Sequence, residues 1–155
     1  MPPRLPILTQ RRIEAAFAKG IYEEMARELG DETAKRILAD AVRKMARATA
    51  AEMAKEAPGG TSLDSFRALK SLWTAEDALQ TETVKSTETE YHFNVVRCRY
   101  AEMYREMGLA ELGGILSCNR DGVFCEGYDP RLKLRRTQTI MSGASHCDFR
   151  YTYEK

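Results

Sequence analysis

The hydrophobic positions in the first third of the chain recur at spacings of three and four residues. In residues 10–29 they share one stripe of a helix and are Ile13, Ala16, Phe17, Ile21, Met25 and Leu29. Gly30 then ends this helix as a C′ glycine, and Asp31 is a good N-cap for a second helix with its own apolar stripe. The pattern predicts a helical hairpin over residues 10–57. Its stripes need a partner surface, because a single helix is marginal in water.

The middle of the chain mixes a helical pattern with an alternating one. After Pro58-Gly59-Gly60, the apolar positions of residues 63–73 predict a short third helix. Residues 79–100 are rich in Thr, Val, Tyr and Phe with alternating character, which predicts two strands and a turn near residues 86–89. Two further short helices are expected, over residues 98–107 and 109–116.

The end of the chain is predicted to complete a sheet. Turn signals at 119–122 and 127–130 enclose a short segment, and residues 132–141 alternate as a strand with one wet face does. A turn over 142–145 leads to a last strand, 146–153. We therefore expect an α+β fold, in which an N-terminal helical hairpin and further helices pack on an antiparallel sheet of about four strands.

The length of 155 residues suits a single domain, 1–155. Within it we expect an extended arm over the proline-containing residues 1–9, the hairpin over 10–57, and an α+β part over 58–155.

Charge and hydropathy exclude several classes of partner. The chain has 24 basic and 23 acidic side chains, so its net charge of +1 provides no field that attracts nucleic acid. Its apolar runs are far shorter than the roughly 20 residues that span a bilayer, and its start lacks the features of a secretory signal. We expect a cytoplasmic protein that binds neither nucleic acid nor membrane and keeps its four cysteines reduced.

A set of spaced residues in the last third carries a family resemblance. It consists of Cys118-Asn119-Arg120-Asp121, Pro130, Leu134, Arg136-Thr137-x-Thr139, Gly143 and Cys147-Asp148-Phe149-Arg150-Tyr151. This set resembles the L-2-amino-thiazoline-4-carboxylic acid hydrolase family, most clearly over residues 96–151. The resemblance implies a cytoplasmic bacterial hydrolase that opens a cyclic isothiourea amino acid towards carbamoyl-cysteine and L-cysteine. The ending Gly143-x-x-x-Cys147-x-Phe149 is also similar to small ligand-binding domains of the vinyl-reductase type, which need not catalyse a reaction.

Cys118 and Asp121 are the first candidates for catalysis. Opening the ring requires a nucleophile at the carbon between sulfur and nitrogen, and Cys118 serves if its thiolate is stabilised. Asp121 is one helical turn further and can accept a proton, although a nearby carboxylate raises the pKa of a thiol. The alternatives are a buried, inert cysteine for Cys118 and a turn residue before Gly122 for Asp121.

Cys147 is the third catalytic candidate. It adjoins His146, and neighbours on a strand point to opposite faces, so at most one of them serves a given site. The resemblance favours Cys147, which we expect to face Cys118, while His146 is exposed. The alternative for Cys147 is core packing beside Phe149.

A cation is needed for the carboxylate of such a substrate. Arg135 and Arg136 are adjacent on a predicted strand, so one faces inward, and the resemblance favours Arg136. Its guanidinium, with Thr137 and Thr139 nearby, suits bidentate capture of a carboxylate. The alternative for Arg136 is a charge on an edge strand that discourages aggregation.

No metal or other cofactor is expected. The four cysteines, at positions 98, 118, 125 and 147, are 20, 7 and 22 residues apart and contain no CxxC pair.

Three functions stay open. The first is hydrolysis of a small cyclic amidine or isothiourea, and the second is binding of a small molecule without turnover. The third is a partner-binding domain in which the hairpin drives homo-oligomerisation. Fast alkylation of a cysteine at pH 7 distinguishes the first from the second.

Overall fold

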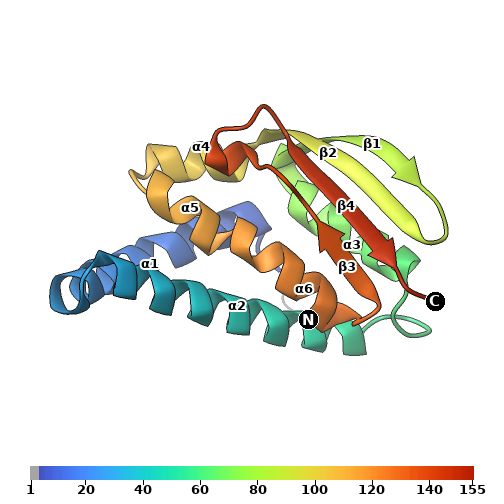
Figure 1. Ribbon diagram of the computed structural model, residues 1–155, viewed down its shortest axis with the longest axis horizontal. Coiled ribbons are helices and arrows are strands. Elements are labelled where there is room, and N and C mark those ends of the chain that lie inside the picture. Colours follow the sequence, from blue (N-terminus) through green and yellow to red (C-terminus); the bar gives the residue numbers. More distant parts are fainter. Residues whose placement is uncertain (1–3) are drawn as a thin grey trace.

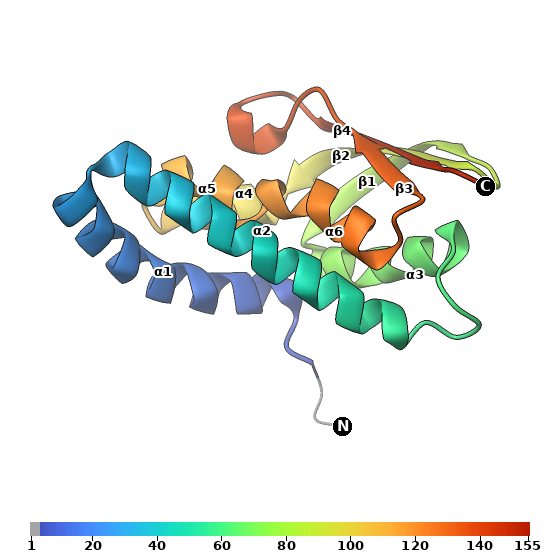
Figure 2. The same cartoon turned by 60° about the horizontal axis from the view of Figure 1, so that its bottom comes forward.

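Two long antiparallel helices begin the fold. The structure is a computed structural model that describes residues 4–155; the first three residues of the expected arm lie outside this range. Helix α1 spans Ile7–Leu29 and helix α2 spans Asp31–Lys55, with Gly30 between them at a φ of 86°. They form the predicted hairpin, which Figure 2 shows from the side.

The expected arm ends earlier than residue 9. Helix α1 begins at Ile7, and the N–H of Gln10 donates to the carbonyl of Pro6 at 3.0 Å. Ile7 and Leu8 pack against the core formed by the helices. That burial extends the helix into the segment that its prolines marked as an arm.

The rest of the chain alternates short helices with strands. In chain order the elements are α3 (Leu63–Thr74), η1 (Ala75–Asp77), β1 (Leu79–Ser86), β2 (Glu90–Cys98), α4 (Arg99–Glu106), α5 (Ala110–Leu116), η2 (Cys118–Arg120), α6 (Asp121–Tyr128), β3 (Leu132–Arg135), η3 (Ile140–Ser142) and β4 (Cys147–Tyr153). The N-cap of α3 is Ser62, whose side chain accepts from the N–H of Ser65 while the hydroxyl of Ser65 accepts from the N–H of Ser62.

The strands form one antiparallel sheet in the order β1-β2-β4-β3. The sheet makes one layer and the helices cover one of its faces (Figures 1 and 2). In the centre of the sheet Phe93 pairs with Phe149, and Val95 pairs with Cys147. This arrangement confirms the predicted fold class of helices packed on a four-stranded antiparallel sheet.

Two predictions about local structure near the end of the chain are wrong. The expected turn at 119–122 is instead η2 and the start of helix α6, and α6 continues to Tyr128, into the second expected turn. Asp121 lies in the first turn of α6, where an acidic residue is favourable, and Pro130 follows its end. Gly127 allows α6 to lie close to α2, since a Cβ there would be 3.0 Å from the carbonyl oxygen of Arg47. The predicted strand 132–141 is paired only as far as Arg135, and the chain then leaves the sheet edge.

The hairpin turns a different face inward from the one we expected. Ile13, Phe17 and Ile21 are 57%, 75% and 46% exposed, and Ala15 is the residue of α1 that is buried. On α2 the buried positions follow one another at intervals of four and are Ala34, Leu38, Val42, Ala46 and Ala50. The side chains on this inner face are mostly small, so the helices can lie close to the rest of the chain, and the larger apolar stripe of α1 is left outside.

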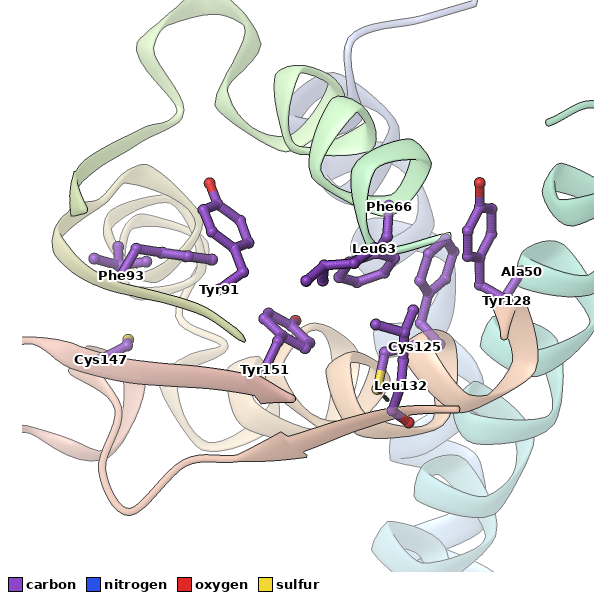
Figure 3. Close-up of a cluster of buried hydrophobic side chains, with 12 residues drawn as sticks. Ala50, Leu63, Phe66, Tyr91, Phe93, Cys125, Tyr128, Leu132, Cys147 and Tyr151 are labelled. Carbon is purple, nitrogen blue, oxygen red and sulfur yellow. Dashed lines mark hydrogen bonds between the residues drawn. The ribbon is translucent and has the colours of Figure 1, made fainter. Parts of the chain in front are cut away.

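Two clusters form the core. One mixes aliphatic side chains with Tyr100 and Tyr104 and lies among α1, α2, α4 and α5, around Leu38 and Val42. The other is aromatic and lies between the sheet, α3 and α6. Figure 3 shows Phe66 and Tyr151 pointing toward each other within it, and their ring centroids are 4.9 Å apart.

Candidate functional site

A large cavity lies between the sheet, helix α3 and the helical hairpin. Its volume is about 1350 Å³, above the 300–1,000 Å³ that is usual for small-molecule pockets. Most of its wall is apolar, and the aromatic residues that line it are Phe17, Phe66, Trp73, Tyr91, Phe93, Tyr100, Phe124, Phe149 and Tyr151. The cavity can therefore hold a molecule with a substantial apolar body.

One polar group interrupts this wall where η2, α6 and the segment after β3 meet. Cys118 is the first residue of η2, Asp121 is the first of α6, and Arg136 follows β3; all three line the cavity. Arg136 forms an ion pair with the carboxylate of Asp121 through Nη1 and donates from Nη2 to the carbonyl of Cys118 at 3.1 Å. The side chains of Arg136 and Asp121 are 17% and 29% exposed. As predicted, Arg136 faces inward and Arg135 is exposed.

Burial is the largest influence on the pKa values of Asp121 and Cys118. It raises the pKa of Asp121, against the opposing effect of the Arg136 guanidinium. It also raises the pKa of the Cys118 thiol to about 12, and the Asp121 carboxylate adds to this rise. Cys118 is thus a neutral thiol at pH 7, whereas Asp121 is a buried carboxylate with increased basicity.

Cys147 and Cys98 line the same cavity as Cys118. The Sγ of Cys147 accepts from the N–H of Ile140 at 3.2 Å, and that of Cys98 accepts from the N–H of Ala101 at 3.4 Å. Burial raises the pKa of both thiols, to about 11 for Cys98. Three cysteines from distant parts of the chain therefore meet at one cavity, and all are protonated. The sequence places Cys98 at the start of a predicted helix and does not predict that it lies in the same site as Cys118 and Cys147.

Cys125 and His146 do not line the cavity. Cys125 is fully buried in the aromatic cluster, where its Sγ donates to the carbonyl of Gly122 at 3.1 Å. His146, which we expected to be exposed, is half-buried because Gln138 and Ser145 pack around it, and its Nδ1 lies 2.9 Å from the hydroxyl of Ser145. His146 and Cys147 point in opposite directions because successive side chains along a strand face opposite sides of the sheet.

Thr137 and Thr139 are outside the cavity lining. The backbone N–H of Thr137 donates to Asp148 at 2.9 Å, and its hydroxyl also binds that carboxylate. Burial opposes ionisation of Asp148, but its hydrogen bonds from Thr137 and Gln138 lower its pKa to about 2. Thr139 accepts from the N–H of Ser142 at 3.1 Å and caps η3. Both threonines organise the connection between β3 and β4.

A metal site and a membrane span are not found in the part of the chain that the structure describes. Among residues 4–155, no three His, Cys, Asp or Glu side chains are grouped so that they could hold a metal ion. Over the same range, each helix is too short or too polar to cross a bilayer.

The fold and the cavity define a small α+β protein with a large, mostly apolar cavity between its sheet and its helices. The chain belongs to the L-2-amino-thiazoline-4-carboxylic acid hydrolase family, whose model matches residues 10–151. Comparison with curated proteins gave no match.

Two solved structures share the fold. One is the phenol-responsive sensory domain of the transcription activator PoxR with phenol, at 16% identity and a TM-score of 0.56, covering 90% of this chain and 73% of that one. The other is a trafficking protein particle complex subunit 3 from Naegleria fowleri covalently bound to palmitic acid, at 10% identity and a TM-score of 0.54, covering 95% and 96%.

Proposed function

We propose that this protein is a hydrolase that opens a C–N bond in a small cyclic amidine or isothiourea bound in the cavity. The observation that carries the proposal is the buried Asp121–Arg136 pair, which faces an otherwise apolar cavity beside Cys118. Membership of the family supports it, and L-2-amino-thiazoline-4-carboxylate is the substrate that the family name implies. Hydrolysis of its ring C–N bond gives a carbamoyl-cysteine.

Asp121 is the proton acceptor in this proposal. Its raised pKa suits a general base that works near neutral pH. Asp121 takes a proton from water as the oxygen adds to the carbon between sulfur and nitrogen. Asp121 passes that proton to the ring nitrogen. The ring C–N bond then breaks as the new hydroxyl becomes a carbonyl, and the proton of this hydroxyl passes through Asp121 to the departing nitrogen, which leaves as a primary amine. Arg136 holds Asp121 in place.

Cys118 and Cys147 are less suited to be the attacking group at rest. A thiol with a pKa of about 12 provides almost no thiolate at pH 7. For Cys118 to attack, Asp121 must first remove its proton, so both routes depend on Asp121.

The test is hydrolysis of L-2-amino-thiazoline-4-carboxylate, followed by loss of ring absorbance. Asp121→Asn is expected to reduce kcat about 100-fold or more, which is the usual contribution of a positioned base. The control Asp40→Asn changes an exposed carboxylate on α2 and is expected to leave kcat unchanged. Cys118→Ala is expected to keep most of the activity; its loss would make Cys118 the nucleophile. Normal turnover by Asp121→Asn contradicts the proposal.

Binding without turnover is the second candidate. The volume and aromatic wall of the cavity favour it, as do the raised thiol pKa values. The two solved structures described above carry phenol and palmitic acid, both of them largely apolar. A rise in Tm on adding a ligand, with no product formed over hours, would support this candidate over the hydrolase.

A second copy of the chain is the partner that the hairpin favours. Ile13 and Ile21 each lie four residues from Phe17, so two α1 helices packed antiparallel about Phe17 would bring these exposed side chains together. The four free cysteines suit a reducing, cytoplasmic compartment.

A further inference from the structure

Lys70 is a charged residue of the cavity wall that the proposed reaction does not use. It lies on α3, is half-buried and lines the cavity. Its Nζ is 4.3 Å from the ring centroid of Phe93 and 5.4 Å from that of Tyr91. These two rings are only 7% and 8% exposed. A lysine at a surface usually extends its ammonium into water, so the position of Lys70 against two buried rings directs its charge into the cavity.

Lys70 is the cation of the cavity wall that has no ion-pair partner within residues 4–155. Each of the other cations that line it forms an ion pair: Arg4 with Glu56, Arg11 and Arg120 with Glu14, and Arg136 with Asp121. Within residues 4–155, Lys70 has no carboxylate within ion-pair distance. The remaining acidic residue of the lining, Glu52, is bound to Lys55. Arg11 and Arg120 share the one carboxylate of Glu14, so the wall carries net positive charge, and Lys70 is the cation in it whose ammonium contacts only aromatic rings.

An aromatic surface connects Lys70 with the Asp121–Arg136 pair. Phe93 and Phe149 are neighbours on β2 and β4, and their rings are nearly parallel with centroids 5.0 Å apart. The guanidinium of Arg136 lies 5.0 Å from the centroid of Phe149. The stacked rings therefore lie between the ammonium of Lys70 and the guanidinium of Arg136, and an extended apolar group packed along their edges would reach from Lys70 to the polar pair.

We infer that the cavity binds an amphiphilic monoanion, a molecule with an aromatic or long aliphatic body and one carboxylate, and that Lys70 binds the carboxylate. The inference rests on the proposed function only in that both place the ligand in the same cavity, and it does not require hydrolysis. The volume of about 1350 Å³ agrees with such a body, because a single five-membered ring would leave most of that space empty. Arg136 is already neutralised by Asp121, so it competes poorly for the carboxylate.

The test compares each of two carboxylates with its neutral amide. The probes are 2-naphthoate with 2-naphthamide, and decanoate with decanamide, measured by isothermal titration at pH 7.5. The wild-type chain is expected to bind each carboxylate about tenfold more tightly than its amide, because a charge-assisted hydrogen bond is lost with the amide. Lys70→Met keeps the length and apolar character of the side chain and is expected to reduce this preference to less than about twofold.

Three further variants make the result specific. Lys70→Arg keeps the charge and is expected to retain the preference. Lys44→Met removes an exposed lysine of α2 and is expected to behave as the wild type. Arg136→Met is expected to keep the preference for the carboxylate over the amide. The inference would be overturned if Arg136→Met lost this preference while Lys70→Met kept it.

Two other outcomes would also overturn it. They are equal binding of carboxylate and amide by the wild type, and no binding of either pair. Selective binding of the carboxylates by a chain that hydrolyses nothing would leave the inference intact while the hydrolase proposal fails. If the wild type and Lys70→Met hydrolyse the thiazoline equally well and Lys70 plays no part in binding carboxylates, the hydrolase proposal would stand and the inference about Lys70 would fail.

Discussion

The sheet half of the molecule buries aromatic side chains, whereas the helical hairpin buries mostly alanines, with Leu38 and Val42, and leaves the aromatic residue Phe17 exposed. Phe66, Phe93 and Tyr151 are each less than 9% exposed, while Phe17 of α1 is 75% exposed. Both regions have amphipathic sequences. They differ in how completely each apolar face is covered: the sheet faces two helices, whereas Phe17 and Ile21 of α1 border the cavity and remain 75% and 46% exposed.

This difference separates two roles of apolar side chains. Those of the sheet half stabilise the fold and form the wall of the cavity. Those on the outer face of the hairpin contribute little to the stability of a single chain and are available to a second copy. The following predictions test this separation.

The largest expected effect is on stability in the aromatic cluster. Phe66→Ala removes ring contacts with Tyr151 and Tyr128, at centroid distances of 4.9 and 5.7 Å. We expect a loss of about 3 kcal/mol in the free energy of unfolding, at the lower end for phenylalanine because Phe66 also borders the cavity. Urea denaturation measures this loss.

Phe17→Ala is the matched change on the outer face. Measured at a concentration where the chain is monomeric, it is expected to cost less than about 1 kcal/mol, as most exposed substitutions do. At high concentration, light scattering is expected to show a dimer for the wild type and half that mass for Phe17→Glu. Equal losses of stability from Phe66→Ala and Phe17→Ala would remove the distinction between the two regions.

Helix α6 packs on α2 where the two regions meet, and disturbing this contact is expected to cause an intermediate loss of stability. A Cβ at Gly127 of α6 would meet the backbone of Arg47 on α2 at 3.0 Å, so Gly127→Ala is expected to cost about 1–3 kcal/mol through overpacking. Gly122 lies in the same helix with open space around it, and Gly122→Ala is expected to be neutral or to stabilise by up to about 1 kcal/mol. Thermal unfolding of both variants measures the contrast, and similar Tm shifts would contradict close packing of α6 on α2.

The smallest expected loss of stability concerns Asp148, which binds the connection between β3 and β4. Asp148 has a pKa of about 2, below the value of about 3.9 for an unfolded chain. Its contribution to stability is therefore complete above pH 4 and is lost as the pH falls towards 2. Asp148→Asn is expected to lower stability at pH 6, and its difference from the wild type should shrink as the pH falls from 4 to 2. A difference that stays constant over this range would exclude an ionised role for Asp148.

Much of the site could be predicted from the sequence because its residues belong to one spaced motif. Cys118, Asp121, Arg136 and Cys147 all line the cavity, and the alternation of adjacent side chains correctly separated Arg136 from Arg135. Thr137 and Thr139 were assigned to the site by nearness in the motif. They turn away because the chain leaves the sheet after Arg135 and their polar groups bind Asp148 and Ser142.

Lys70 and Cys98 were missed as members of this cavity. Each lies in an ordinary helix or strand pattern far from the motif, and no local signal marks it. They could not be found from sequence because the pairing of strands and the packing of α3 on β2 bring together residues that are distant in the chain.

The sequence by itself determined the helical hairpin, the alternation of later helices and strands, the fold class and most of the polar group at the cavity. These depend on periodicity, turn residues and a spaced motif, all of which are local. Only the tertiary structure decided which face of α1 is buried, that residues 121–128 form a helix, where the strand after residue 132 ends, and that Lys70 has no carboxylate partner. Those depend on what packs opposite each side chain, which is a property of the whole fold.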